Sequence, residues 1–121
     1  MIHTNHRIVY ETRGDTLVIR LYGEIDHHSA VDVRAQIDEK LLAERPASVC
    51  LDLSAIDFMD SSGLGLMMGR LSLVRRYGGT FSVLDPSPAA QKMICLAGME
   101  RLLAIRYTKQ ERNQNHEQNH R

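Results

Sequence analysis

The chain has 121 residues, which is enough for one domain that buries a hydrophobic core without disulfides or a bound metal. Lys and Arg together number 15, and Asp and Glu also number 15, so the formal net charge at pH 7 is zero. This balance argues against a protein that binds nucleic acid or a charged membrane surface.

The cysteines, the N-terminal residues and the lengths of the apolar runs indicate the compartment of the protein. Cys50 and Cys95 each lie in an apolar stretch, where a thiol behaves as a small hydrophobic side chain. Residues 1–13 are polar and lack the apolar run of a secretory signal peptide, and no apolar run approaches the length that crosses a bilayer. We therefore expect a reduced, soluble, cytoplasmic protein.

The first 22 residues predict a β-hairpin. Residues 7–12 alternate in polarity, and residues 16–22 alternate in the same way. Gly14 and Asp15 lie between them and are typical turn residues. We expect two antiparallel strands.

A helix and a strand follow the hairpin. Residues 23–29 interrupt the strand pattern, and Ser29 is a suitable N-cap with Asp32 three residues later. Pro46 ends the helix, and residues 48–54 predict a strand whose apolar centre suits a sheet covered on both faces. Helical spacing predicts one buried stripe on this helix, formed by Ala30, Val33, Ile37 and Leu41.

The sequence Asp-Ser-Ser-Gly at residues 60–63 supplies side chains that cap the start of a second helix. Gly63 and Gly65 leave its first turn without bulky side chains. We therefore expect the hydroxyls of Ser61 and Ser62 to face solvent at the positive end of the helix, where an anion is favoured. Another chain would be able to approach the backbone closely at Gly63.

The second helix has a predicted buried face and a flanking face. The buried face consists of Leu64, Met67, Met68, Leu71 and Val74. Leu66, Arg70 and Leu73 fall on the flanking face. The two leucines are either ordinary core or, if exposed, an apolar patch beside Ser62 that suits a partner. Gly78 and Gly79 end the helix.

The remaining elements complete an α/β pattern. Residues 80–84 predict a strand, and Ser87 caps a third helix with Pro88 at its first position. Residues 102–107 predict a short last strand or the beginning of a helix. Ala89, Met93 and Leu96 line the third helix. An initial hairpin followed by alternating strands and helices predicts a single α/β domain with a mixed sheet.

The C-terminal residues 108–121 contain no apolar side chain. This tail is unable to bury a face, so we expect a frayed helix or disorder and place the folded domain at residues 1–107. Residues 116–120 match the zinc-protease pattern His-Glu-x-x-His, but that chemistry requires a packed helix and a third ligand. We interpret the match as chance and expect no metal and no cofactor.

Two other candidate chemistries are weak. A serine hydrolase requires Gly-x-Ser-x-Gly, and neither Ser61 nor Ser62 has this pattern around it. Asp26, His27 and His28 are candidate metal ligands or an acid–base pair. Adjacent histidines in an extended segment point to opposite sides, so we prefer a loop that places polar side chains beside a helix start. The residues indicate a recognition surface rather than an enzyme, with an esterase as the weaker hypothesis.

Two motifs carry a resemblance to a known family. Phe-Met-Asp-Ser-Ser-Gly-Leu-Gly at residues 58–65, together with Gly-Glu-Ile-Asp-His-His-Ser-Ala at residues 23–30, resembles the STAS domain family, and most closely its sporulation anti-sigma factor antagonists. The resemblance runs from the first strand to about Tyr107. The family ends in a helix with an apolar face, whereas this chain is polar after Tyr107, a departure that concerns the last helix and not the switch.

The resemblance implies a function for Ser62, the second serine of the motif. In the family this serine is phosphorylated by a partner that is both an anti-sigma factor and an ATP-dependent serine kinase, and the partner binds the nucleotide. The unphosphorylated form captures the kinase and releases the sigma factor, and a serine phosphatase resets the switch.

From the motif and the resemblance we predict an anti-sigma factor antagonist in sporulation, without enzyme activity and phosphorylated at Ser62. The alternative is a STAS interaction module of another partner-switching, stress-signalling or transport-associated assembly. We expect neither nucleic acid nor a membrane as a partner. The predicted partner-binding residues are Asp26, His27, His28, Asp60, Ser61, Gly63, Leu64, Leu66 and Arg70.

Overall fold

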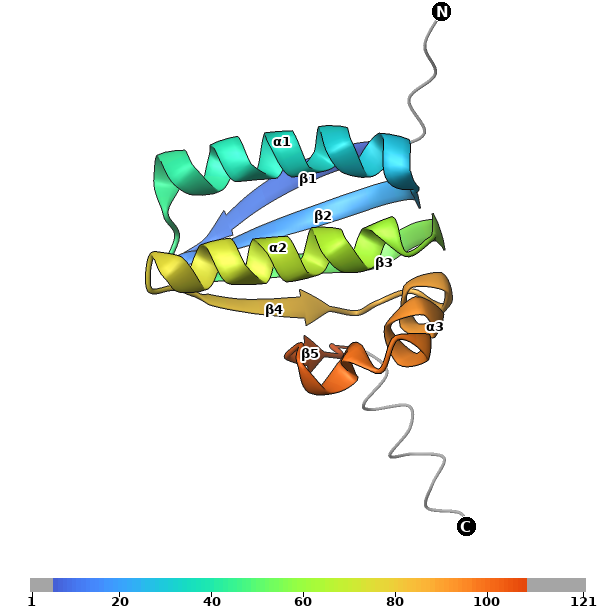
Figure 1. Ribbon diagram of the computed structural model, residues 1–121. Coiled ribbons are helices and arrows are strands. Elements are labelled where there is room, and N and C mark those ends of the chain that lie inside the picture. The colour runs from blue at the N-terminus through green and yellow to red at the C-terminus, as the bar shows by residue number, and fades with distance from the viewer. Residues whose placement is uncertain (1–5, 109–121) are drawn as a thin grey trace, which may run out of the picture.

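The computed structural model describes residues 6–108, which form a mixed α/β domain (Figure 1). Its strands are β1 (His6–Arg13), β2 (Thr16–Ile25), β3 (Ser48–Met59), β4 (Thr80–Leu84) and β5 (Ile105–Arg106). Its helices are α1 (His27–Glu44), α2 (Ser62–Arg76) and α3 (Pro88–Leu96), with a short 3-10 helix, η1 (Met99–Arg101). The predicted α/β class is therefore confirmed for the described residues.

The five strands form one sheet in the order β1-β2-β3-β4-β5. β1 and β2 pair antiparallel through a turn in which Gly14 has a φ of 63°, a conformation that glycine adopts without steric cost. The other neighbours, β2–β3, β3–β4 and β4–β5, pair parallel. The hairpin and the mixed sheet are as the sequence predicts.

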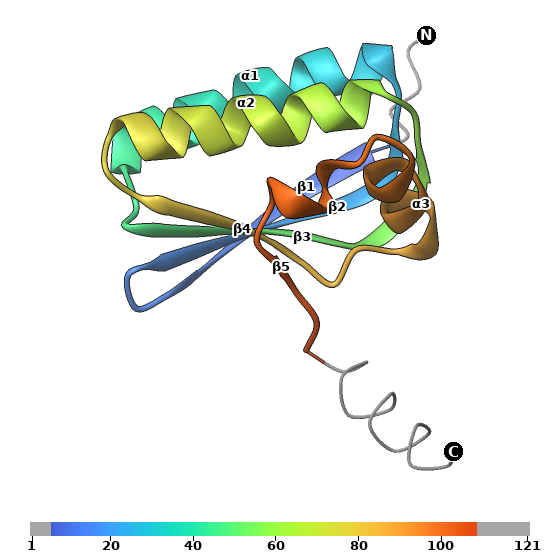
Figure 2. The same ribbon diagram turned by 60° about the horizontal axis from the view of Figure 1, so that its bottom comes forward.

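Both long helices cover the same face of the sheet. α1 and α2 lie side by side (Figure 1), and both lie above the sheet in the turned view of Figure 2. No helix in residues 6–108 covers the opposite face, so the predicted two-sided cover of β3 is wrong. The low exposure of Cys50 and Asp52 on that face comes from polar neighbours, because Ser82 lies against the thiol and Arg20 pairs with the carboxylate.

β2 and β3 are longer than predicted and run up to the helix starts. β2 continues to Ile25 and β3 continues to Met59, and these two residues pair with one another. The alternation of polarity is lost here because the β2–β3 register shifts twice, once beside Gly23, whose φ is 99°. The polarity pattern therefore predicted the ends of both strands too early.

The predicted buried face of α3 is partly correct, because Met93 packs against the core whereas Leu96 does not. Ser87 caps it and Pro88 occupies its first position, as expected. Its buried residues are Ala90 and Ile94, whereas Leu96 is 72% exposed. Nine residues give this helix only a narrow contact line with the sheet, and helical spacing alone did not identify that line.

The end of the described chain corrects one expectation and leaves one untested. Cys95 is exposed, so its expected apolar surroundings are wrong. The predicted tail, apart from Thr108, and the His-Glu-x-x-His match lie outside the described residues. Among residues 6–108, no helix combines the length and the apolar composition needed to cross a membrane.

Candidate functional site

The starts of α1 and α2 meet at one edge of the sheet. β2 and β3 are parallel neighbours, so both end at this edge, and each leads directly into a helix (Figure 1). The backbone N–H of Asp60 donates to the carbonyl of Ile25 at 3.0 Å, which links the two connections. The predicted loop at Asp26 and the predicted serines at the start of α2 therefore lie beside one another.

Asp26 is the N-cap of α1, and Ser29 is not. The Oδ1 atom of Asp26 accepts hydrogen bonds from the N–H groups of His28 at 3.0 Å and Ser29 at 2.9 Å. The Ser29 hydroxyl accepts from the Asp26 N–H at 2.9 Å and so completes a capping box. The bond from the Ser29 N–H lowers the pKa of Asp26, so its carboxylate is charged at neutral pH.

His27 and His28 occupy the first turn of α1, so the expectation of an extended segment is wrong. Their rings lie with centroids 4.0 Å apart at a tilt of 36°, and both residues are exposed. Within residues 6–108, no three His, Cys, Asp or Glu side chains are grouped to hold a metal ion. The pair is a polar, accessible part of the surface next to Asp26.

Ser62 is the first residue of α2, and its N–H donates to Oδ1 of Asp60 at 2.8 Å. Asp60 therefore supplies the capping side chain, while Ser61 occupies the N-cap position without a side-chain cap bond. Among the hydrogen bonds of residues 6–108, none uses the hydroxyl of either serine. Ser61 is exposed and Ser62 is half-buried, so the expected pair of accessible hydroxyls is present.

Gly63 serves the interior and not the surface, so its predicted role in partner contact is wrong. The residue is buried, and a Cβ atom there would lie 2.5 Å from Cγ and 2.6 Å from Sδ of Met59. Atoms at those distances overlap. With glycine at position 63, the first turn of α2 packs directly on the Met59 side chain at the end of β3, and a larger residue would force that side chain to move.

Gly65 and Gly69 have open space where Gly63 has none. Apart from the adjoining residues and the nearby backbone of the same helix, a Cβ atom at either position would have no atom within 4 Å. Because residues three and four apart share one side of a helix, these two glycines and Ser62 lie along one outer face of α2. Gly69 is not among the predicted site residues, although the helical spacing of residues 62, 65 and 69 indicates that it lies on the same face as Ser62.

Leu66 and Arg70 are interior residues, so their prediction as partner contacts is wrong. Leu66 is 4% exposed and belongs to the core, while Arg70 is 6% exposed between α1 and α2. Their face of α2 points to α1 because the two helices cover the same side of the sheet. Leu64 is half-buried, and only part of it reaches the surface.

Arg70 makes an ion pair with Asp38 of α1. Its Nε lies 2.9 Å from Oδ1 of Asp38, but the angle is too poor for a hydrogen bond, and the Nη1 atom has no partner among the described residues. We interpret the contact as ionic and not as a formed hydrogen bond. Burial lowers the pKa of Arg70, and the Asp38 carboxylate opposes this effect.

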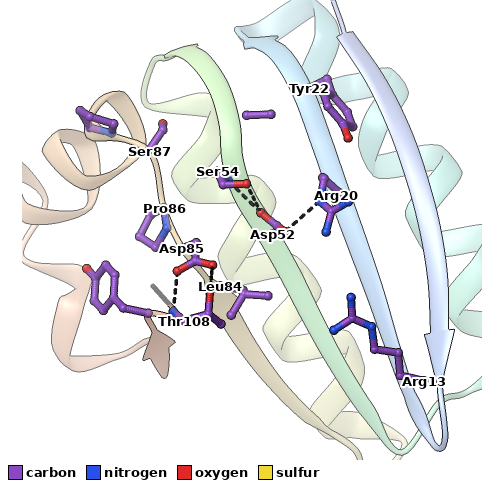
Figure 3. A pocket seen from close by; sticks show the side chains of 13 residues that line it. Arg13, Arg20, Tyr22, Asp52, Ser54, Leu84, Asp85, Pro86, Ser87 and Thr108 are labelled. Carbon is purple, nitrogen blue, oxygen red and sulfur yellow. Dashed lines mark hydrogen bonds and ion pairs between the residues drawn. The ribbon is translucent and has the colours of Figure 1, made fainter. Parts of the chain in front are cut away.

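A groove of about 690 Å³ lies apart from the serine site, on the face of the sheet that no described helix covers (Figure 3). At its floor, Oδ2 of Asp52 accepts from Nε of Arg20 at 2.9 Å, and Oδ1 accepts from the Ser54 hydroxyl at 2.7 Å. The Asp85 carboxylate accepts from the Thr108 N–H at 2.7 Å on the opposite wall. None of the predicted site residues lines this groove.

Several known proteins are similar to this chain in sequence and in fold. The anti-sigma F factor antagonist of Paenibacillus polymyxa is 36% identical over 101 residues, which are 84% of this chain and 86% of that protein. The solved structure of the anti-sigma factor antagonist SpoIIAA in its unphosphorylated form is 30% identical with a TM-score of 0.71. The match covers 90% of this chain and 95% of the chain in that structure.

The Bacillus cell fate determinant SpoIIAA in its phosphorylated form is also similar, at 30% identity and a TM-score of 0.66. The match covers 90% of this chain and 98% of that chain. A family profile described as "STAS domain" matches residues 7–112, which include Ser61, Ser62 and all the described helices and strands except His6, the first residue of β1. The chain therefore belongs to the STAS domain family.

Proposed function

We propose that this protein is an anti-sigma factor antagonist that binds its anti-sigma factor while Ser62 is unphosphorylated. Curated relatives are named antagonists of anti-sigma F and anti-sigma-B factors, and SpoIIAA has been solved both with and without phosphate. The observation that carries the proposal is the accessible Ser62 hydroxyl at the start of α2. The partner is a serine kinase in this proposal, and a serine phosphatase reverses its action.

The geometry supports Ser62 as a phosphate acceptor. Asp60 fixes the backbone of Ser62 through the 2.8 Å bond to its N–H and leaves the hydroxyl without a bond in the described residues. In the transfer, the Ser62 oxygen forms a bond to the γ-phosphorus of ATP, and the bond from that phosphorus to the bridging oxygen of ADP breaks. The partner supplies the nucleotide, the magnesium and the base that takes the hydroxyl proton.

The same geometry explains why the phosphorylated protein remains folded and yet leaves its partner. A phosphate adds about −1.5 to −2 charges at neutral pH, and the helix N-terminus favours negative charge. Asp60 and Asp26 add repulsion, but none of these residues is fully buried in the free protein, so solvent screens the charges. A partner surface that fits the bare hydroxyl of Ser62 would bury the phosphate without a countercharge, which costs several kcal/mol.

The outer face of α2 supports a close-packing partner. A glycine inside a helix costs about 0.5–1 kcal/mol relative to alanine. Packing within the described chain does not require glycine at position 65 or 69, because a side chain at either position would extend into open space. We propose that the partner packs on these glycines beside Ser62. The remaining proposed contact residues are Asp26, His27, His28, Asp60, Ser61 and Leu64.

Phosphorylation with labelled ATP tests the assignment of Ser62. The kinase is the purified anti-sigma F factor of Paenibacillus polymyxa, and the substrates are wild type, Ser62→Ala and Ser61→Ala. Since only Ser62 is the proposed acceptor, wild type and Ser61→Ala should incorporate label to similar extents, and Ser62→Ala should incorporate none. Label on Ser62→Ala at the wild-type level would assign the acceptor to another residue.

A further inference from the structure

Phe58 is exposed although the apolar residues on either side of it are buried. It is 48% exposed, whereas Ile56 is 3% and Met59 is 5% exposed. The other phenylalanine of the chain, Phe81, lies in the core. About half of this large apolar ring, four residues before Ser62, is exposed, and within residues 6–108 it is not among the side chains that pack on the core.

A bulge at the end of β3 produces this exposure. Gly23 pairs with Ile56, but the next residue of β2, Glu24, pairs with Phe58, so Asp57 is an extra residue in the ladder. Bulges re-aim side chains and are frequent next to functional sites. Here the bulge turns Asp57 and Phe58 to solvent in succession while it keeps the flanking residues buried.

The two segments that pair at Phe58 carry charge of one sign, and the nearest cation along the ladder is Arg7 of β1, which lies over the ring of Tyr22. Residues 22–31 and 55–65 contain no Lys or Arg. Between them they carry the four carboxylates of Glu24, Asp26, Asp57 and Asp60. An exposed aromatic ring with acidic neighbours is complementary to an apolar pocket that is rimmed by basic side chains.

We propose that Phe58 is the apolar anchor of the interface with the anti-sigma factor, and that it enters an apolar pocket of that partner lined at its edge by Lys or Arg. This inference rests on the proposed function. Interfaces of ordinary size bury about 800 Å² and 20–30 residues on each side, and Phe58 lies only four residues before Ser62 in the chain. Buried aromatic side chains carry much of the binding energy in such contacts.

Fluorine NMR tests the anchor without a substitution at Phe58. The chain has two phenylalanines, so labelling with 4-fluorophenylalanine gives one signal for Phe58 and an internal control from buried Phe81. The Ser62→Ala background prevents phosphorylation. On addition of the Paenibacillus polymyxa anti-sigma F factor with Mg-ADP, the Phe58 signal should shift or broaden while the Phe81 signal stays. An unmoved Phe58 signal in a complex that calorimetry detects would overturn the inference.

Calorimetry of Phe58→Ala separates this inference from the proposed function. The dissociation constant should rise at least tenfold, which corresponds to about 1.4 kcal/mol. Leu42→Ala, at an exposed apolar position toward the other end of α1, is the matched control and should bind as wild type does. Wild-type affinity in Phe58→Ala overturns the anchor alone, whereas a wild-type protein that fails to bind overturns the proposed function as well. A Phe58 signal that moves with protein concentration alone assigns the ring to self-association and also overturns the anchor.

Discussion

The inner and outer sides of α2 use the same residue type for opposite purposes. On the inner side, Gly63 lies against Met59, and a Cβ atom there would overlap the Met59 side chain unless that side chain moved. On the outer side, Gly65 and Gly69 have empty space above them. The inner glycine permits this close packing, while the outer glycines reduce helix stability and leave a low surface beside Ser62.

One short motif therefore combines a structural role with the proposed recognition role. Substitutions on the inner side should change stability, and substitutions on the outer side should change binding.

The largest effect is expected from charge on the outer side. Ser62→Asp should weaken binding of the anti-sigma F factor by about a hundredfold or more, since a buried unpaired carboxylate costs several kcal/mol. The melting temperature should stay near that of wild type because the helix N-terminus tolerates the charge. Thr80→Asp, which places a carboxylate at the start of β4, is the control and should bind normally. Equal binding by Ser62→Asp and Thr80→Asp would rule out charge as the cause of release.

On the inner side, Gly63→Ala should lower the free energy of unfolding by about 1–3 kcal/mol, as overpacked positions typically do. The added methyl group would overlap Cγ of Met59 at 2.5 Å. Denaturant titration measures the loss. The double variant Gly63→Ala, Met59→Ala removes the overlap, so its cost should be smaller than the sum of the two single costs. Strict additivity would mean that the two side chains do not compete for this space.

Substitution of the outer glycines by alanine should raise the stability of the protein and weaken its binding to the partner. Gly65→Ala and Gly69→Ala should each raise the free energy of unfolding by about 0.5–1 kcal/mol, because alanine favours the helix. Each should also weaken binding of the anti-sigma F factor, because a methyl group fills the space proposed for the partner. Denaturant titration and calorimetry report the two quantities. Variants that gain stability and keep full affinity would show that the partner does not pack here.

The smallest effect concerns the cap of α1 and its dependence on pH. The pKa of Asp26 is lowered in the folded protein, so its charged form adds stability above the ordinary pKa of aspartate, about 3.9, and this stability is lost as the pH falls through the lowered value. Asp26→Asn keeps a capping oxygen without the charge. The variant should be slightly less stable than wild type at pH 7, and the difference should vanish in acid. A difference that is constant with pH would contradict the charged cap.

Much of the fold is readable in the sequence because its signals are local. The turn at Gly14, the cap at Ser87 and the helix end before Pro46 each depend on a few neighbouring residues, and all three occur in the structure. The ends of β2 and β3 were not readable, since the register shifts depend on pairing between segments far apart in sequence. The buried line of α3 was missed for a similar reason, because it depends on where the short helix touches the sheet.

The candidate site also has features that the sequence predicts and features that it does not. The accessible serines and the proximity of Asp26 follow from motif and topology, because parallel strands end at the same edge of a sheet. Which helix residues face inward depends on the position of α1, so Leu66 and Arg70 were assigned to the wrong side. Gly63 was misassigned because its neighbour, Met59, belongs to the preceding strand and its direction is not visible in sequence.

The most direct test of the switch compares two forms of the native protein. The wild-type chain is phosphorylated to completion by the Paenibacillus polymyxa anti-sigma F factor, purified, and titrated against fresh anti-sigma factor beside the unphosphorylated chain. The unphosphorylated form should bind, and the phosphorylated form should bind at least about a hundredfold more weakly with an unchanged circular dichroism spectrum, since a buried unpaired charge costs several kcal/mol. Equal dissociation constants for the two forms would contradict the proposed switch at Ser62.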